Sequence, residues 1–235
     1  MNDLLLQLYS QYWDGMIQNI YLQHESAYPF LIQATPHYQT ARKRIMFCGQ
    51  ETNGWGGEYP IPDATKPNDL MNIYNIVVNR NNNGEPIKRP GYYIRTNKLI
   101  NSPYWNFQWR IMSQNPDVGY VVQNIVKIGK RVGAGCNDTI YQLTKAFFPV
   151  WKRELKILNP NCIIFLTGPY DRRIREIVGD FTLEPIKNVN GLLDRLVFED
   201  SLMPVAYRTN HPRFLQSNHQ YVDMATVISD IITNL

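Results

Sequence analysis

Four short polar segments hold the residues best suited to chemistry, and each follows an apolar stretch of the sequence. They are Gly49–Trp55, Gln123–Lys127, Thr167–Asp171 and Thr209–Arg213. Among their side chains are the carboxylate of Glu51, the amide of Asn124 and the imidazole of His211. An amide and an imidazole can hydrogen-bond the edge of a planar polar ligand, and fixed donors can stabilise charge that develops in a reaction. These residue types therefore favour recognition of a planar polar molecule.

The stretches between these segments predict the elements that position them. Short apolar runs predict buried strands, and apolar residues at helical spacing predict helices. We expect strands at 43–48, 119–126, 162–167 and 203–208, with an edge strand at 196–198. We expect helices at 3–22, 69–79, 104–113, 138–158, 170–178 and 217–235. Pro149 should kink or divide the fourth of these helices.

Apolar strands that alternate with helices are typical of an open parallel sheet with helices on both faces. We therefore expect an α/β fold, a three-layer αβα sandwich around a four-stranded parallel sheet. Ligand sites in such sheets lie beyond the carboxyl ends of the strands, where the four polar segments fall. A chain of 235 residues can bury a core without disulfides. We expect one domain at 41–235, with residues 1–40 as an N-terminal helical extension packed on it.

Composition and motifs exclude several classes of protein. Hydrophobic residues make up 44% of the chain and aromatic residues 12%, which excludes a disordered chain. The net charge is 24 − 20 = +4, which permits a polyanionic partner without requiring one. The sequence has no phosphate-binding loop, no dinucleotide-binding fingerprint and no Gly-x-Ser-x-Gly turn. We therefore expect no cofactor.

The cysteines bear on the expected compartment and on metal binding. The three cysteines are scattered, so they form neither an iron–sulfur cluster nor a Cys-x-x-Cys zinc site, and we expect no metal. Cysteines without a disulfide framework favour a reducing compartment. No apolar run of about 18 residues and no secretion signal is present. We expect a cytoplasmic protein that makes no membrane contact.

Taken in order, the four segments resemble the motifs of the uracil-DNA glycosylase superfamily. The run Gly49-Gln-Glu-Thr-Asn53 resembles the family's first motif, Gly-Gln-Asp-Pro-Tyr, and Tyr120–Asn124 resembles the strand that ends in a base-recognising asparagine. The run Cys162–Tyr170 resembles a strand that enters a helix through glycine. The run Thr209–Arg213 resembles the closing His-Pro-Ser motif. The resemblance extends from about residue 43 to the C-terminus.

The resemblance implies a glycosylase-like α/β fold and an enzyme that flips uracil or another altered base from DNA and hydrolyses its N-glycosidic bond. Asn124 would read the O4 and N3–H edge of uracil, and His211 would donate to O2. Glu51, which replaces the family's aspartate, would orient water or stabilise an oxocarbenium-like sugar. Main-chain amides near Gln50 would add to the site. The stacking ring would be Trp55 or Tyr59, although the residue types favour packing beneath the loop over stacking.

The resemblance also implies contacts with DNA, single- or double-stranded. Arg213 would meet a phosphate, and Phe214 and Leu215 would fill the space that the flipped base leaves. Lys127 and Lys130, beside glycines, would bind further phosphates. We expect a monomer.

Two other hypotheses follow from the same residues. Glu51 in place of aspartate, and Arg213 in place of serine, favour a catalytically weak or inactive member of the fold that binds nucleic acid or a nucleotide. The polar amides at the strand ends would also serve a hydrolase that acts on a free nucleoside or nucleotide.

Overall fold

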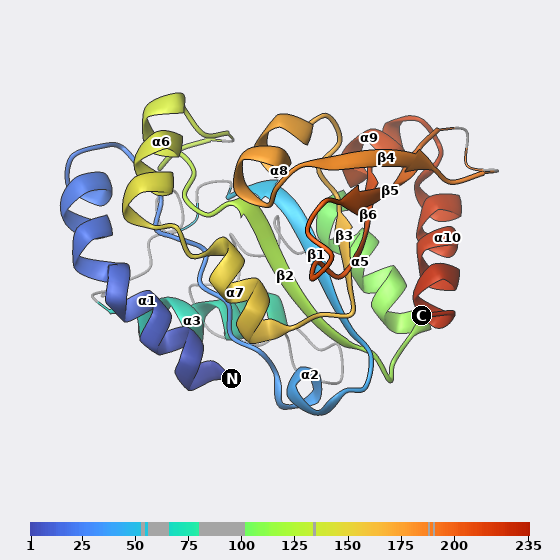
Figure 1. Cartoon of the computed structure of the whole chain (residues 1–235), viewed down its shortest axis with the longest axis horizontal. Helices are drawn as coiled ribbons and strands as arrows, with labels where there is room; N and C mark the ends of the chain where they lie inside the picture. Colours follow the sequence, from blue (N-terminus) through green and yellow to red (C-terminus); the bar gives the residue numbers. More distant parts are fainter. Residues whose placement is uncertain (53–54, 56–65, 80–101, 134, 188, 190) are drawn as a thin grey trace. The chain divides into compact units, whose positions relative to one another are not determined.

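The computed structural model describes residues 1–52, 55, 66–79, 102–133, 135–187, 189 and 191–235, which Figure 1 draws in colour. These residues contain a six-stranded sheet in the order β2-β1-β3-β6-β5-β4. The strands are β1 (Arg44–Glu51), β2 (Gly119–Val126), β3 (Cys162–Phe165), β4 (Phe181–Pro185), β5 (Leu193–Phe198) and β6 (Val205–Thr209).

The three strands β1, β3 and β6 run parallel, in a register that joins Ile45 to Cys162 and Cys162 to Val205. Beyond β6 the direction reverses, because β5 is antiparallel to β6 and β4 is antiparallel to β5. The predicted α/β class is confirmed, but the sheet is mixed and has six strands rather than four. Strand β4 escaped prediction because four of its five residues are exposed, so it shows no apolar run.

The helices near the N-terminus and in the first half of the chain follow the apolar spacing. They are α1 (Asn2–Met16), α2 (Pro36–Thr40), α3 (Pro67–Tyr74) and α5 (Pro103–Gln114). Single π-helical turns at Ile17–Tyr21 and Asn75–Asn79 extend α1 and α3 to about the predicted ends. The Oγ of Ser102 caps α5 by accepting from the Trp105 amide at 3.4 Å.

The helices in the second half of the chain are shorter than the spacing of their apolar residues predicts. The predicted helix at 138–158 is divided into α6 (Asp138–Phe147) and α7 (Trp151–Leu158), as Pro149 requires. Helix α8 spans Asp171–Ile177. The predicted C-terminal helix at 217–235 is wrong at its start, because Ser217 ends α9 (Pro212–Ser217) and α10 (Tyr221–Thr233) begins afterwards. His219, between them, has a positive φ of 58° that no helix continues through.

The chain divides into two compact units, each built from three separate stretches of sequence. Unit 1 holds residues 1–35, the described parts of 50–87, and 123–158. Unit 2 holds residues 36–49, the described part of 88–122, and 159–235. The N-terminal helix α1 therefore shares a unit with α3, α6 and α7, all of which it contacts.

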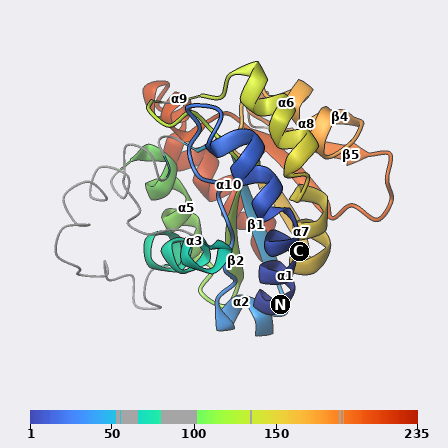
Figure 2. The ribbon, with the colours of Figure 1, turned by 90° about the vertical axis from the view of Figure 1, so that its left-hand side faces the viewer.

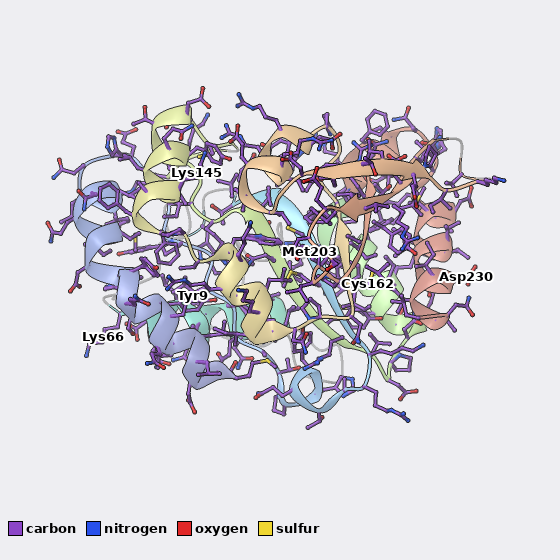
Figure 3. All side chains as sticks on the ribbon, viewed as in Figure 1. Tyr9, Lys66, Lys145, Cys162, Met203 and Asp230 are labelled. Carbon is purple, nitrogen blue, oxygen red and sulfur yellow. The ribbon has the colours of Figure 1, made fainter. Side chains whose placement is uncertain are left out.

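The core of unit 2 lies between the sheet and three helices. Helices α5, α9 and α10 contact one another and lie side by side in Figures 1 and 2. Their apolar faces meet Ile45 and Phe47 of β1 and Cys162 and Ile164 of β3, each fully buried. Cys162 is labelled in Figure 3, within the side chains of this unit. This packing fixes the carboxyl ends of the parallel strands.

Candidate functional site

The paired stretches of β1, β3 and β6 end together at one edge of the sheet in unit 2, where Cys48, Phe165 and Arg208 are register partners. The Leu166 amide donates to the Cys48 carbonyl at 2.8 Å, and the Gly168 amide donates to the Thr209 carbonyl at 3.0 Å. Gly168 has a φ of +55°, and a Cβ built there would lie 3.6 Å from the backbone nitrogen of His211. The positive φ, which other residues rarely adopt, favours glycine at 168, where the loops after β3 and β6 meet.

His211 follows β6 at this edge and caps helix α9. Its Nδ1 accepts a hydrogen bond from the Arg213 amide at 3.2 Å. Because Nδ1 is the acceptor, the neutral ring carries its proton on Nε2, which remains a donor. The ring stacks on Tyr104 with centroids 5.6 Å apart and planes 15° apart. Burial, and then the nearby Arg213 charge, lower the pKa of His211 below 6.5, so the ring is neutral at pH 7.

The lowered pKa gives stability a pH dependence that can be measured. The unfolded chain binds this proton more readily than the folded one, so the free energy of unfolding should fall as pH drops from 6.5 through the folded pKa. Above pH 6.5 both states are neutral and His211 adds no slope. Urea unfolding from about pH 8 to about pH 5 should give a stability difference between wild type and His211→Asn that changes only below about pH 6.5. A difference that is constant with pH would contradict the assignment.

The three residues expected to touch DNA after His211 have different environments. Arg213 is exposed, and Phe214 is 50% exposed. Leu215 is fully buried in the core of unit 2, because each step along a helix turns the side chain by about 100°. The prediction that Leu215 enters DNA is therefore wrong, and Phe214 is the residue of the pair that can reach a partner.

In unit 1, the end of β1 contacts the loop that follows β2. The Thr52 Oγ1 accepts from the Gly129 amide at 3.0 Å. The loop closes on itself where the Lys130 amide donates to the Gly135 carbonyl at 3.0 Å. A Cβ built on Gly135 would lie 3.7 Å from the Lys130 Nζ and 4.0 Å from the Glu51 Oε1. Two predicted site residues, Glu51 and Lys130, thus lie against the same glycine.

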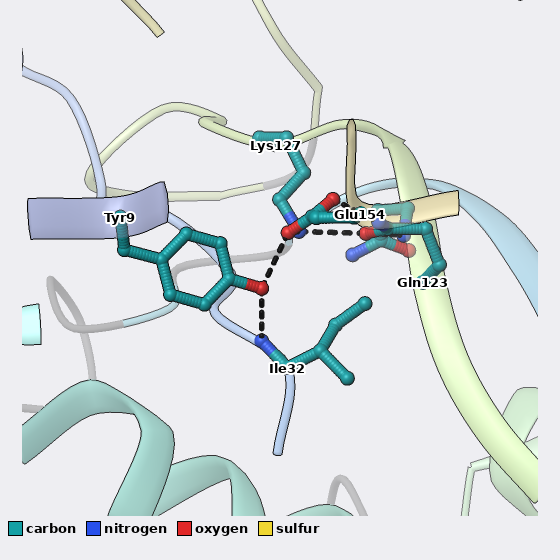
Figure 4. Close-up of polar contacts among 6 residues, drawn as sticks. Tyr9, Ile32, Gln123, Lys127 and Glu154 are labelled. Carbon is teal, nitrogen blue, oxygen red and sulfur yellow. Dashed lines mark hydrogen bonds and ion pairs between the residues drawn. The ribbon is translucent and has the colours of Figure 1, made fainter. Parts of the chain in front are cut away.

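The end of β2 carries Asn124 beside a buried polar cluster, drawn in Figure 4. Asn124 is 8% exposed, and its backbone N–H donates to the Gln123 Oε1 at 2.9 Å. Lys127 is 2% exposed, and its ammonium lies 2.8 Å from the Glu154 Oε1. The prediction that Lys127 binds a DNA phosphate is therefore corrected, because the buried ion pair holds its charge inside unit 1.

Glu154 and Tyr9 complete this cluster, and neither is among the predicted site residues. The Tyr9 hydroxyl donates to the Glu154 Oε1 at 2.6 Å. Burial and then Glu154 raise the pKa of Tyr9 well above its ordinary value. The sequence did contain an indication, because Glu154 lies on the apolar stripe of α7 formed by Trp151, Leu155 and Leu158. A carboxylate on such a stripe is buried only with a partner.

Of the two aromatic residues proposed for base stacking, only Trp55 lies within the described residues. Trp55 is 8% exposed and packs edge-on against Phe30, with centroids 5.0 Å apart. Its carbonyl accepts from the Tyr28 amide at 2.9 Å, which ties it into unit 1. A stacking role for Trp55 stays a prediction. Tyr59 lies outside the described residues.

No family model matches the sequence, and no curated protein matches it. Within the residues that the structure describes, no group of three or more His, Cys, Asp or Glu side chains is arranged to hold a metal ion. In the same part of the chain, no helix is long and apolar enough to span a membrane.

Proposed function

We propose that the protein is a DNA glycosylase of the uracil-DNA glycosylase type, which extrudes uracil or another altered base and hydrolyses its N-glycosidic bond. The observation that carries the proposal is the register of β1, β3 and β6. It sets the ends of the first, third and closing motifs at one edge, where α/β sheets bind ligands. The proposal takes β2 as a fourth parallel strand beside β1, within a three-layer glycosylase fold.

The state of His211 supports a role in charge stabilisation. Negative charge develops on O2 of uracil as the glycosidic bond breaks, and a fixed donor there lowers the barrier. The bond from the Arg213 amide to Nδ1 leaves the Nε2–H as that donor. Stacking on Tyr104 limits rotation of the imidazole. In the proposed reaction, His211 therefore acts as a neutral hydrogen-bond donor that does not release its proton.

The proposed reaction also assigns roles to Asn124 and Glu51. The Asn124 side chain offers one donor and one acceptor, which matches the N3–H and O4 edge of uracil. Glu51 orients the attacking water or stabilises the cationic sugar. The water oxygen bonds to C1′ as the C1′–N bond breaks, and the proton that water loses balances the one that the free base finally gains.

An abasic-site assay tests the proposal. Oligonucleotides that contain uracil, hypoxanthine or xanthine, single- and double-stranded, are incubated with excess protein, and alkali then cleaves any abasic sites. We expect release of uracil. Absence of release from every substrate would overturn the proposal. Salt-sensitive DNA binding without release would instead support the inactive nucleic-acid-binding hypothesis.

Lys130 provides a test of DNA binding that does not depend on catalysis. Lys130 is exposed at the loop after β2, and removal of one lysine–phosphate interaction reduces the slope of log K against log salt by about 0.7 to 0.9. We expect Lys130→Gln to reduce the slope for a uracil-free oligonucleotide by about that amount, as measured by fluorescence anisotropy. The matched control is Lys145→Gln on α6, another exposed lysine, labelled in Figure 3. Equal slopes for the two variants would contradict a phosphate-binding role for Lys130.

A further inference from the structure

The buried cluster of unit 1 is connected directly to the residue proposed to read the base. Gln123 and Glu154 are fully buried, and Lys127 is nearly so. The Lys127 ammonium donates to the Glu154 Oε1 at 2.8 Å and to the Gln123 Oε1 at 2.7 Å. The Gln123 Nε2 donates to the other oxygen of Glu154. Both ends of the Gln123 amide are therefore held by charged groups.

The same Gln123 oxygen accepts the backbone N–H of Asn124 at 2.9 Å. A buried backbone donor needs an acceptor, and a side chain supplies it for this amide. Among the residues that the structure describes, β2 is the terminal strand of the sheet order, with a strand neighbour on one side only. Successive side chains of a strand point to opposite faces, so Gln123 meets the cluster on one face while Asn124 faces the other. The Gln123 side chain thus links the cluster to the backbone that carries Asn124.

Stability alone does not account for a charged cluster at this point. A buried ion pair is often no more stabilising than apolar side chains of the same size. Here the pair comes with further hydrogen bonds, because the Tyr9 hydroxyl bridges the Glu154 carboxylate and the Ile32 amide at 2.6 Å and 3.1 Å. Figure 4 shows Tyr9 of α1, Gln123 of β2 and Lys127, which follows β2, directed at Glu154 of α7. The cluster therefore fixes orientation, which apolar packing specifies less sharply.

We propose that Gln123, held by Lys127 and Glu154, is a positioning residue that fixes Asn124 for reading the base. The role in reading a base rests on the proposed function, but the constraint on Asn124 depends only on contacts within unit 1. It gives the cluster a part in base selection without contact between its members and the substrate. Displacement of a recognition group by about 1 Å can lower a rate about a hundredfold.

The first test measures the constraint without any activity. In Gln123→Met, the Asn124 amide should lose at least about tenfold of its protection against hydrogen exchange, measured by NMR. The Ile164 amide, in the middle of β3, should keep its protection, which shows that the loss is local. Gln108→Met is the matched control, since Gln108 is also fully buried but lies in unit 2. That variant should leave protection of Asn124 unchanged.

The second test measures base selection. In Gln123→Met, the ratio of kcat/KM for uracil to that for cytosine should fall about tenfold or more, with kcat affected more than KM. In an Asn124→Ala background, Gln123→Met should leave the ratio unchanged, because the group it positions is gone. A purely structural role would give the same loss in both backgrounds.

The outcomes separate this inference from the proposed function. If wild type releases no base, the proposed function fails, while hydrogen exchange still decides whether Gln123 constrains Asn124. Unchanged protection of Asn124 in Gln123→Met, or an equal change in the Asn124→Ala background, would overturn the inference. Should Gln123→Met not fold, Lys127→Met/Glu154→Leu replaces the ion pair with apolar groups and should give the same local loss at Asn124.

Discussion

Replacing His211 with alanine should lower kcat/KM for uracil release by about a hundredfold to a thousandfold. That loss is typical when one fixed donor to a developing negative charge is removed. The structure identifies the donor as the Nε2–H, because the Nδ1 accepts from the Arg213 amide. The measurement is single-turnover release of uracil at pH 7.5 or so, where the lowered pKa keeps the ring neutral.

A second substitution separates catalysis from helix capping. Alanine at 211 also removes the acceptor for the Arg213 amide, which costs about 1 kcal/mol. His211→Asn restores a capping oxygen without the Nε2–H, so it should recover stability and remain as slow as the alanine variant. His24→Ala, which changes a partly exposed histidine of unit 1, should keep wild-type activity. A rate within tenfold of wild type for His211→Asn would exclude the proposed role.

Replacing Glu154 with leucine should lower the free energy of unfolding by about 3–5 kcal/mol. The substitution leaves the Lys127 ammonium buried without its carboxylate, and removing one partner of a buried ion pair costs about that much. For a chain of this length the loss corresponds to a fall in Tm of roughly 6–20 °C. Thermal unfolding followed by circular dichroism measures it.

The double variant tests the cause of that loss. Lys127→Met/Glu154→Leu removes both charges, so most of the lost stability should return. An exposed ion pair on α8 serves as the comparison for this loss of stability. Its Arg172 Nε and Glu176 Oε1 lie 3.7 Å apart. Glu176→Gln should change stability by less than about 1 kcal/mol. A double variant no more stable than Glu154→Leu would show that packing, and not the unpaired charge, causes the loss.

Strands β1 and β3 could be predicted because they are buried on both faces along most of their length. Residues such as Ile163 and Ile164 form continuous apolar runs, which are visible without the structure. Strand β4 could not be predicted, since its pairing with β5 buries only Phe181. The start of the last helix was misjudged because Ser217 is a residue type that often begins a helix. Here Pro212 begins a short helix first, and Ser217 ends it.

The strand ends that carry the candidate site residues could be predicted, but the directions of the side chains that follow them could not. Strand ends identify where polar groups collect, and His211 and Glu51 follow from that rule. The rule says nothing about which way a side chain faces. Lys127 and Leu215 were therefore assigned to DNA from residue type, although the structure buries both. For Lys127 the missing information was the partner, Glu154, which lies 27 residues further along the chain.

The bond between Tyr9 and Glu154 joins residues 145 positions apart and has a consequence for synthesis of the chain. Unit 1 combines residues 1–35 with residues up to 158, so a nascent chain cannot complete it until residue 158 has been made. Until then the apolar stripe of α1, including Leu5 and Trp13, has none of its α6 and α7 contacts. Long-range contacts of this kind slow folding and leave apolar surface open to aggregation. Helix α1 therefore lacks part of its apolar packing until the residues of α6 and α7 have been made.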